Sequence, residues 1–228
     1  MAKFEIDGIT LRIPENCLTP PLVKALENGN YEHTETAALK RHVRADDRVL
    51  DLGAGAGFVS AQAARIVGGA NVTSVEASPD MLEVLRRNLD ENGARDATIL
   101  NGAVVADTHD GDDVKFAVRD AFWASSISDN EREAAHRLHA VPALRLSDLI
   151  DAHRPSIIVM DVEGAEASLC LQPLADCVRI LIMEIHTRQY DATVLKKMFD
   201  GLSASGMTYM PWGTRGEVVV FQRVAPET

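Results

Sequence analysis

Two pairs of ionisable residues follow apolar stretches of strand length in the second half of the chain. Asp161 and Glu163 come directly after the apolar run 157–160, and Glu184 and His186 end the next apolar run with the same spacing. If the chain stays extended, residues two apart point to the same side of a strand. Carboxylates and an imidazole at adjacent strand ends suit general acid–base chemistry, so these four are the predicted catalytic residues. His186 is the preferred general base because its intrinsic pKa lies near neutrality.

Other interpretations of these residues remain open. Glu163 and Glu166 could instead favour the N-terminus of the following helix through its dipole, and His186 could be a hydrogen-bonded histidine at a strand end. Asp161 and Glu184 could also hold a divalent cation that lowers the pKa of an alcohol. The spacing does not require a cation, so no metal site is predicted.

A glycine-rich turn lies between a predicted strand and a predicted helix. The stretch "VLDLGAGAGFVS" (49–60) places glycines at 53, 55 and 57. Glycine allows a tight turn and brings backbone close to a ligand, and the start of a helix directs amides at the loop. The dinucleotide fingerprint GxGxxG would need glycine or alanine where this chain has Phe58. The loop therefore matches an NAD site poorly and the first motif of class I S-adenosylmethionine methyltransferases well.

Two further residues extend this predicted binding site. Glu76 ends the next predicted strand, where a carboxylate can accept hydrogen bonds from both hydroxyls of a ribose. Asn101 follows the third predicted strand, at the position where such folds contact adenine. Asn101 could equally be a turn residue.

Apolar runs alternate with helical periodicity over most of the chain, which predicts the fold class. Strongly apolar strands between helices indicate a mostly parallel sheet covered on both faces, and the last two strands are close enough for an antiparallel hairpin. We expect a doubly wound, seven-stranded, Rossmann-like α/β fold with an antiparallel hairpin at the C-terminal edge. The expected strands are 47–53, 71–77, 97–105, 156–164, 178–186, 207–213 and 217–224, and the expected helices lie within 20–45, 57–69, 78–93, 165–177 and 190–206.

Composition narrows the possible partners. The formal net charge is −11, which disfavours nucleic acid as a substrate. No stretch of about 18 apolar residues predicts a membrane span, and the N-terminus has no secretory signal. The three cysteines are irregularly spaced, as expected for reduced thiols in a cytoplasmic protein. Composition does not predict the oligomeric state.

With these motifs in order, the sequence resembles the FkbM-type methyltransferases from about residue 30 to residue 222. The glycine loop alone indicates only the class I superfamily, whereas the ordered combination with "MDVEGAE" and "LIMEIH" is more specific. The motifs that carry the resemblance are "NYEHTE" (30–35), "VLDLGAGAGFVS" (49–60), "VEASPDMLEVLRRNL" (75–89), "NGAV" (101–104), "VPALRLSDLID" (141–151), "MDVEGAE" (160–166) and "LIMEIH" (181–186). One departure is Ser147–Asp148, where the family more often has a threonine-leucine-aspartate run.

The resemblance implies S-adenosylmethionine as cofactor and assigns residues to its site. Tyr31 and Glu32 would close over the methionine end from the N-terminal segment, and Asp161 would lie beside the transferable methyl. The other implied cofactor contacts are Asp51, Gly53, Ala54, Gly55, Phe58, Glu76, Ala77, Asn101 and Ala103.

We expect a single methyltransferase domain over 1–228, with a cap at 1–45 and a core at 46–228 that carries an insertion at about 106–143. Three aromatic residues of the insertion, Phe116, Phe122 and Trp123, could form a wall over the acceptor site or a small core of their own.

The resemblance also implies the reaction class. It indicates an O-methyltransferase that acts on a hydroxyl of a small molecule or glycan, without a membrane partner. A divalent cation is possible but not indicated. The alternatives are a module that binds S-adenosylmethionine without catalysis and, less favoured, an NAD-dependent oxidoreductase.

Overall fold

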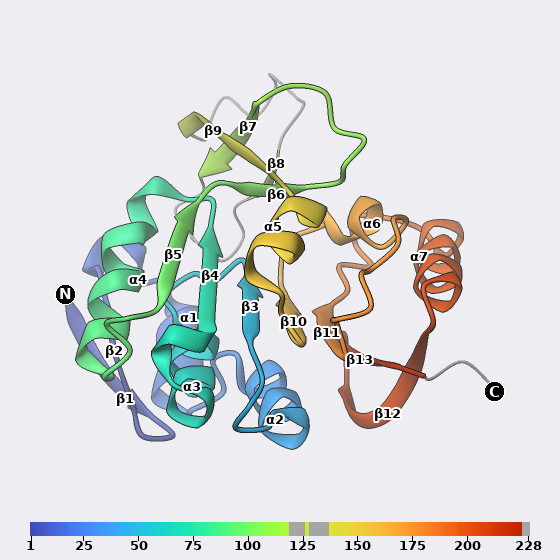
Figure 1. Cartoon of the computed structure of the whole chain (residues 1–228). Coiled ribbons are helices and arrows are strands. Elements are labelled where there is room, and N and C mark those ends of the chain that lie inside the picture. Colours follow the sequence, from blue (N-terminus) through green and yellow to red (C-terminus); the bar gives the residue numbers. More distant parts are fainter. Residues whose placement is uncertain (119–125, 128–136, 225–228) are drawn as a thin grey trace.

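The computed structural model describes residues 1–118, 126–127 and 137–224, and a seven-stranded sheet forms its centre (Figure 1). The strand order is β12-β13-β11-β10-β3-β4-β5. In this sheet β13 runs in the opposite direction to the other six strands, which are parallel to one another. The strands are β3 (Val49–Leu52), β4 (Val72–Glu76), β5 (Thr98–Asn101), β10 (Ile157–Met160), β11 (Ile180–Glu184), β12 (Met207–Arg215) and β13 (Val218–Arg223). This topology confirms the predicted doubly wound α/β class and the C-terminal hairpin.

Helices cover both faces of the sheet, and alternate residues of each central strand point to opposite faces. In β10, Ile157 and Val159 join the core beneath α1–α4, whereas Ile158 and Met160 join the core beneath α5–α7. The helices are α1 (Pro20–Glu27), α2 (His33–His42), α3 (Phe58–Val67), α4 (Pro79–Glu91), α5 (Leu146–His153), α6 (Glu166–Leu169) and α7 (Ala192–Ala204). Among the described residues, no helix has the length and apolar character that crossing a membrane requires.

A second, four-stranded sheet with the order β6-β9-β7-β8 lies above the carboxyl ends of the main strands (Figure 1). Its strands are β6 (Ala103–Val105), β7 (Asp113–Val118), β8 (Ser126–Ile127) and β9 (Arg137–Arg145). It occupies the region predicted to be an insertion, and Phe116 packs in its small core. Phe122 and Trp123 lie outside the described residues.

The prediction of one strand over 97–105 is wrong, because the chain divides at Gly102. β5 stays in the main sheet, whereas β6 pairs in parallel with β9. A side chain at Gly102 would place its Cβ 2.7 Å from the carbonyl oxygen of Pro142. Glycine therefore permits β9 to approach the chain where it leaves the main sheet.

The predicted helix over 165–177 is also much shorter than expected. α6 ends at Leu169, and the chain then continues through turns to β11. Pro173 lacks the amide hydrogen that a continuing helix would use. The apolar spacing of this segment reflects burial of Leu169 and Leu174 rather than a long helix.

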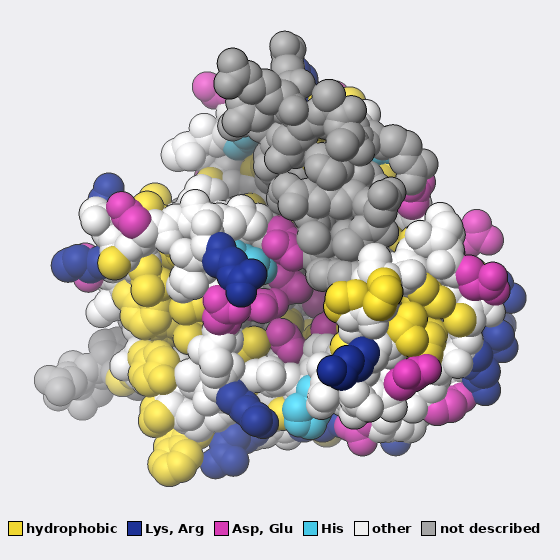
Figure 2. Space-filling model, turned by 180° about the vertical axis from the view of Figure 1, so that it is seen from behind, with side chains coloured by type: hydrophobic (Ala, Val, Ile, Leu, Met, Phe, Trp, Pro, Cys, Tyr) yellow, Lys and Arg dark blue, Asp and Glu magenta, His cyan; other side chains and the backbone are white. Residues whose placement is uncertain are grey.

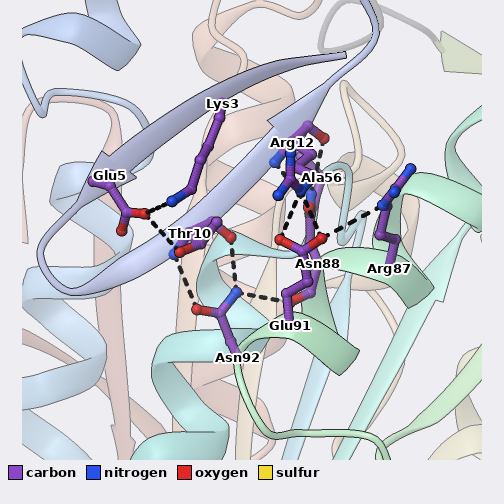
Figure 3. Close-up of polar contacts among 9 residues, drawn as sticks. All are labelled: Lys3, Glu5, Thr10, Arg12, Ala56, Arg87, Asn88, Glu91 and Asn92. Atoms are coloured by element: carbon purple, nitrogen blue, oxygen red, sulfur yellow. Dashed lines mark hydrogen bonds and ion pairs between the residues drawn. The ribbon is translucent and has the colours of Figure 1, made fainter.

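The N-terminal segment begins with a hairpin, β1 (Ala2–Ile6) and β2 (Ile9–Ile13), that docks on α4 (Figure 3). Asn92 pairs with the backbone of Thr10 through bonds of 2.9 and 2.8 Å. Asn88, one turn earlier, accepts from the amide of Arg12 at 2.8 Å and donates to its carbonyl oxygen at 3.2 Å. The Asn88 amide also donates to the carbonyl of Ala56 at 2.8 Å, so the hairpin, α4 and the glycine loop form one hydrogen-bonded unit.

Candidate active site

A cleft of about 640 Å³, here called the loop cleft, lies at the carboxyl ends of β3, β4 and β10. Open α/β sheets bind ligands at this edge. Eight of the predicted cofactor residues line the cleft: Tyr31, Glu32, Gly53, Gly55, Glu76, Ala77, Ala103 and Asp161. Phe116 of the small sheet also lines it, so this aromatic residue contributes both to a core and to the wall of the site.

Glu76 is held in the loop cleft by two backbone amides. Its two carboxylate oxygens accept hydrogen bonds from the amide of Gly55 at 2.7 Å and from the amide of Ser78 at 2.6 Å. Burial raises the pKa of Glu76, and the two amide donors oppose that shift. Each oxygen has a second lone pair, so the carboxylate can accept further hydrogen bonds from a ligand.

Four predicted cofactor residues lie away from this cleft. Asp51 and Ala54 line a small adjoining cavity instead. The Asp51 carboxylate accepts from Ser60 of α3, and burial raises its pKa to about 7. Phe58 is buried against Tyr31, with ring centroids 6.0 Å apart. The Asn101 amide donates to the carbonyl oxygens of Glu76 and Ala77, as a turn residue would.

Gly53 allows the glycine loop to contact the segment after β10. A side chain at this position would place its Cβ 1.8 Å from the carbonyl oxygen of Asp161. Gly53 also has a φ of +86°, a conformation that favours glycine. The loop and the segment that carries Asp161 therefore pack directly against each other.

Tyr31 and Glu32 line the loop cleft from the segment before α2. Tyr31 is 7% exposed. The Tyr31 hydroxyl and the Glu32 carboxylate interact with each other, and within the described part of the chain neither the hydroxyl nor one buried oxygen of Glu32 has a well-aligned hydrogen bond. Burial raises the pKa of both groups. Buried polar atoms without well-aligned hydrogen bonds are rare, and these two lie where a ligand would supply partners.

A wider groove of about 1600 Å³, here called the acidic groove, meets the loop cleft at Asp161 and Glu163. Glu184 and His186 line it as well, so all four predicted catalytic residues lie on its wall. Figure 2 shows acidic side chains gathered in the hollow of this face of the molecule. The carboxylates that line the groove are Glu32, Glu35, Asp161, Glu163, Glu184 and Glu217.

The His186 ring is fixed on one side by Glu166, which is fully buried. Glu166 accepts hydrogen bonds of 3.0 Å from both the backbone amide and Nδ1 of His186, and one of 2.9 Å from Tyr190. On the other side, Nε2 of the ring lies 3.5 Å from a carboxylate oxygen of Asp161 and 3.5 Å from one of Glu163. Only Nε2 is therefore directed into the site.

The surrounding carboxylates change the acid–base properties of His186. Burial alone would lower its pKa, but Glu166, Asp161 and Glu163 outweigh that effect and raise it to about 9. Burial and the charge of Glu184 raise the pKa of Asp161. At neutral pH the ring is protonated in this arrangement, which works against its predicted role as a general base.

The four predicted catalytic residues converge by a different route from the one expected. β10 ends at Met160, and Glu163 has a φ of +49°, so the chain is not extended there. The parallel pairing of β10 with β11 brings the two strand ends together instead. Sequence reasoning missed the role of Glu166, which it considered only for the dipole of the following helix. The motif "MDVEGAE" contains Glu166 and Gly164, whose amide donates to Glu166 at 2.8 Å, but the other partners, His186 and Tyr190, come from the segment after β11.

Comparisons with known proteins match the part of the chain that contains the glycine loop. Residues 49–141, which include the glycine loop, Glu76 and Ala103, match a family model described as a methyltransferase domain. Over 73 residues the chain is 37% identical to the ribosomal protein L11 methyltransferase of Thermus thermophilus. That stretch covers 31% of this chain and 28% of the relative's length.

Solved structures of methyltransferases are also similar to this chain. Methyltransferase FkbM from Methylobacillus flagellatus has 17% identity and a TM-score of 0.48, with 91% of this chain and 56% of that chain covered. TYW2 from M. jannaschii, solved in complex with AdoMet, has 12% identity and a TM-score of 0.49, with 97% and 86% covered.

Proposed function

We propose that the protein is an S-adenosylmethionine-dependent methyltransferase of the FkbM type. The observation that carries the proposal is the position of Asp161, which lines both the loop cleft and the acidic groove. A methyl donor in the cleft and an acceptor in the groove would meet at this residue. The match of residues 49–141 to a methyltransferase domain supports the same assignment.

The residues of the loop cleft suit S-adenosylmethionine. Glu76 has acceptor capacity left for ribose hydroxyls, and Tyr31 and Glu32 present buried polar atoms that make no well-aligned hydrogen bond among the described residues. When bound, S-adenosylmethionine supplies a methyl group on a sulfonium centre. The contribution of this chain is to align the acceptor with that methyl and to exclude water from the junction.

We propose a hydroxyl of a small molecule or glycan as the methyl acceptor. The resemblance to FkbM-type enzymes supports O-methylation, and the carboxylates of the acidic groove would repel a polyanion such as nucleic acid. An alcohol must lose its proton on methylation, and the carboxylates that can receive it are Asp161 and Glu163 at the junction and Glu184 in the adjoining groove.

The charge of the groove favours a second acceptor class, an amine. The six acidic side chains of the groove outnumber Arg188 and the protonated His186, so the groove would attract a cationic group. The Thermus thermophilus relative is named for a protein substrate. An amine on a small molecule or protein is therefore the second candidate.

A transfer assay with S-adenosylmethionine labelled in its methyl group tests the proposal. The purified protein is incubated with metabolite, polysaccharide and protein fractions, and the products are separated on a cation exchanger. Label in neutral products supports a hydroxyl acceptor, and label in retained cationic products supports an amine. If S-adenosylhomocysteine binds but no fraction accepts label, the protein is a binding module rather than an enzyme.

A further inference from the structure

We propose that Asp161, Glu163 and His186 form a binding site for a divalent cation at the junction of the loop cleft and the acidic groove. The role of this cation in methyl transfer depends on the proposed function, whereas its binding does not. The site differs from the pair considered from sequence, Asp161 with Glu184, because it includes an imidazole and a residue from the turn after β10.

The distances among the three side chains suit a common ligand. Nε2 of His186 lies 3.5 Å from Asp161 Oδ1 and 3.5 Å from Glu163 Oε2. One ligand atom from each residue lies within 4.8 Å of the other two. Metal–ligand bonds of about 2.0–2.2 Å would bridge these gaps after small side-chain movements.

The orientation of His186 also suits metal binding. A metal-ligating histidine usually donates its second ring nitrogen to a carboxylate or carbonyl, which fixes the tautomer and the ring plane. Here Nδ1 is 3.0 Å from the fully buried carboxylate of Glu166. With the proton on Nδ1, the lone pair of Nε2 points at Asp161 and Glu163.

Two observations beyond the charge of the cluster point to a ligand. Asp161 Oδ1 is a buried atom whose nearby charged group is Nε2 of His186 at 3.5 Å, and it accepts no well-aligned hydrogen bond from the described part of the chain. The hydroxyl of Tyr31, on a side chain that is 7% exposed and lines both the cleft and the groove, is close to Glu32 but also makes no well-aligned hydrogen bond there.

The competing state of the same residues is an imidazolium between two carboxylates. The pKa of His186 is raised because the neighbouring carboxylates stabilise this imidazolium. A cation would replace the proton, because the same electrostatic field that holds a proton on Nε2 attracts a metal ion. The two states therefore exclude each other and can be distinguished by direct binding.

The donor set indicates the kind of cation. One imidazole and two carboxylates suit Mn²⁺, Fe²⁺ or Zn²⁺, whereas a site built from oxygen ligands alone suits Mg²⁺ or Ca²⁺. A cation here would take the acceptor oxygen as a further ligand and lower the pKa of its hydroxyl. The acceptor proton would then pass to the carboxylate of Glu184, an O–C bond would form, the C–S bond would break, and the sulfur would keep its electron pair in neutral S-adenosylhomocysteine.

Titration with Mn²⁺ alone, followed by the electron paramagnetic resonance signal of the free ion, tests the proposal. We expect one bound Mn²⁺ for each chain. His186→Ala and Glu163→Gln should weaken binding about tenfold or more. Glu166→Gln removes no metal ligand but disturbs the carboxylate that holds His186, and it should weaken binding about 10–100-fold. Glu217→Gln removes the same charge elsewhere in the acidic groove and should leave Mn²⁺ affinity unchanged.

Binding of S-adenosylhomocysteine and thermal unfolding show that each variant is folded. The proposal is overturned if the wild-type protein takes up no Mn²⁺, or if Glu163→Gln and His186→Ala bind it as tightly as wild type. Failure of the proposed function has a different signature, in which Mn²⁺ binds but S-adenosylhomocysteine does not.

Discussion

Replacing Glu76 with alanine should weaken binding of S-adenosylhomocysteine, because Glu76 is the predicted acceptor for the ribose hydroxyls. A hydrogen bond to a charged group contributes about 1.5–3 kcal/mol. Loss of one such bond corresponds to a roughly 10- to 150-fold increase in Kd. The alanine also leaves the amides of Gly55 and Ser78 without their acceptor, which loosens the loop and adds to the loss.

Isothermal titration calorimetry with S-adenosylhomocysteine measures this effect. Glu83→Gln is the matched control, since Glu83 is an exposed acid on α4 outside the residues that line the loop cleft. Glu76→Gln separates the two contributions, because its amide has one oxygen and can serve only one of the two backbone donors. A folded Glu76→Ala variant with a Kd within about threefold of wild type would refute the ribose assignment.

Three further substitutions test other parts of the site. The pKa of Asp51 is about 7 in the folded protein and 3.8 for a free side chain. Between these two pH values the folded state binds more protons than the unfolded state, so the free energy of unfolding declines as the pH rises from 3.8 to 7. Asp51→Asn should remove this decline, which is worth up to about 4 kcal/mol. Thermal unfolding measured at acidic and alkaline pH tests this, and the same dependence of stability on pH in the variant and the wild type would contradict the assignment. Tyr31→Phe should weaken S-adenosylhomocysteine about tenfold if the hydroxyl contacts the ligand, without loss of stability; an unchanged Kd would place the hydroxyl outside the ligand site. Phe58→Ala should cost about 3–5 kcal/mol of unfolding free energy in urea, whereas a cost below about 1 kcal/mol would show that the site is not tightly packed.

The sequence contained enough information to predict the fold and the edge of the sheet that carries the site. Strand and helix periodicity are local properties, and parallel neighbours necessarily end at the same edge. The glycine turn after β3 and Glu76 at the end of β4 therefore lie together, as the structure shows. For the same reason, the parallel neighbours β10 and β11 bring Asp161 and His186 to one place.

The direction of individual side chains could not be predicted in the same way. All four residues of β3 are buried, so its sequence has no polar alternation that would show which face Asp51 occupies. In the structure this carboxylate points toward α3 and Ser60 instead of the loop cleft. The left-handed turn at Glu163 and the contact of Glu166 with His186 depend on tertiary packing, which local patterns do not encode.

The docking of the N-terminal hairpin on α4 also has a consequence for folding during synthesis. The hydrogen bonds from Asn88 and Asn92 reach backbone groups 76 and 82 positions earlier in the chain. An isolated two-stranded hairpin is only marginally stable in water, so β1 and β2 must wait for α4 to be synthesised before they are held in place. Because Asn88 also binds the carbonyl of Ala56, these contacts to the glycine loop form at the same stage. The nascent chain therefore completes the unit of hairpin, α4 and glycine loop only after the ribosome has passed α4.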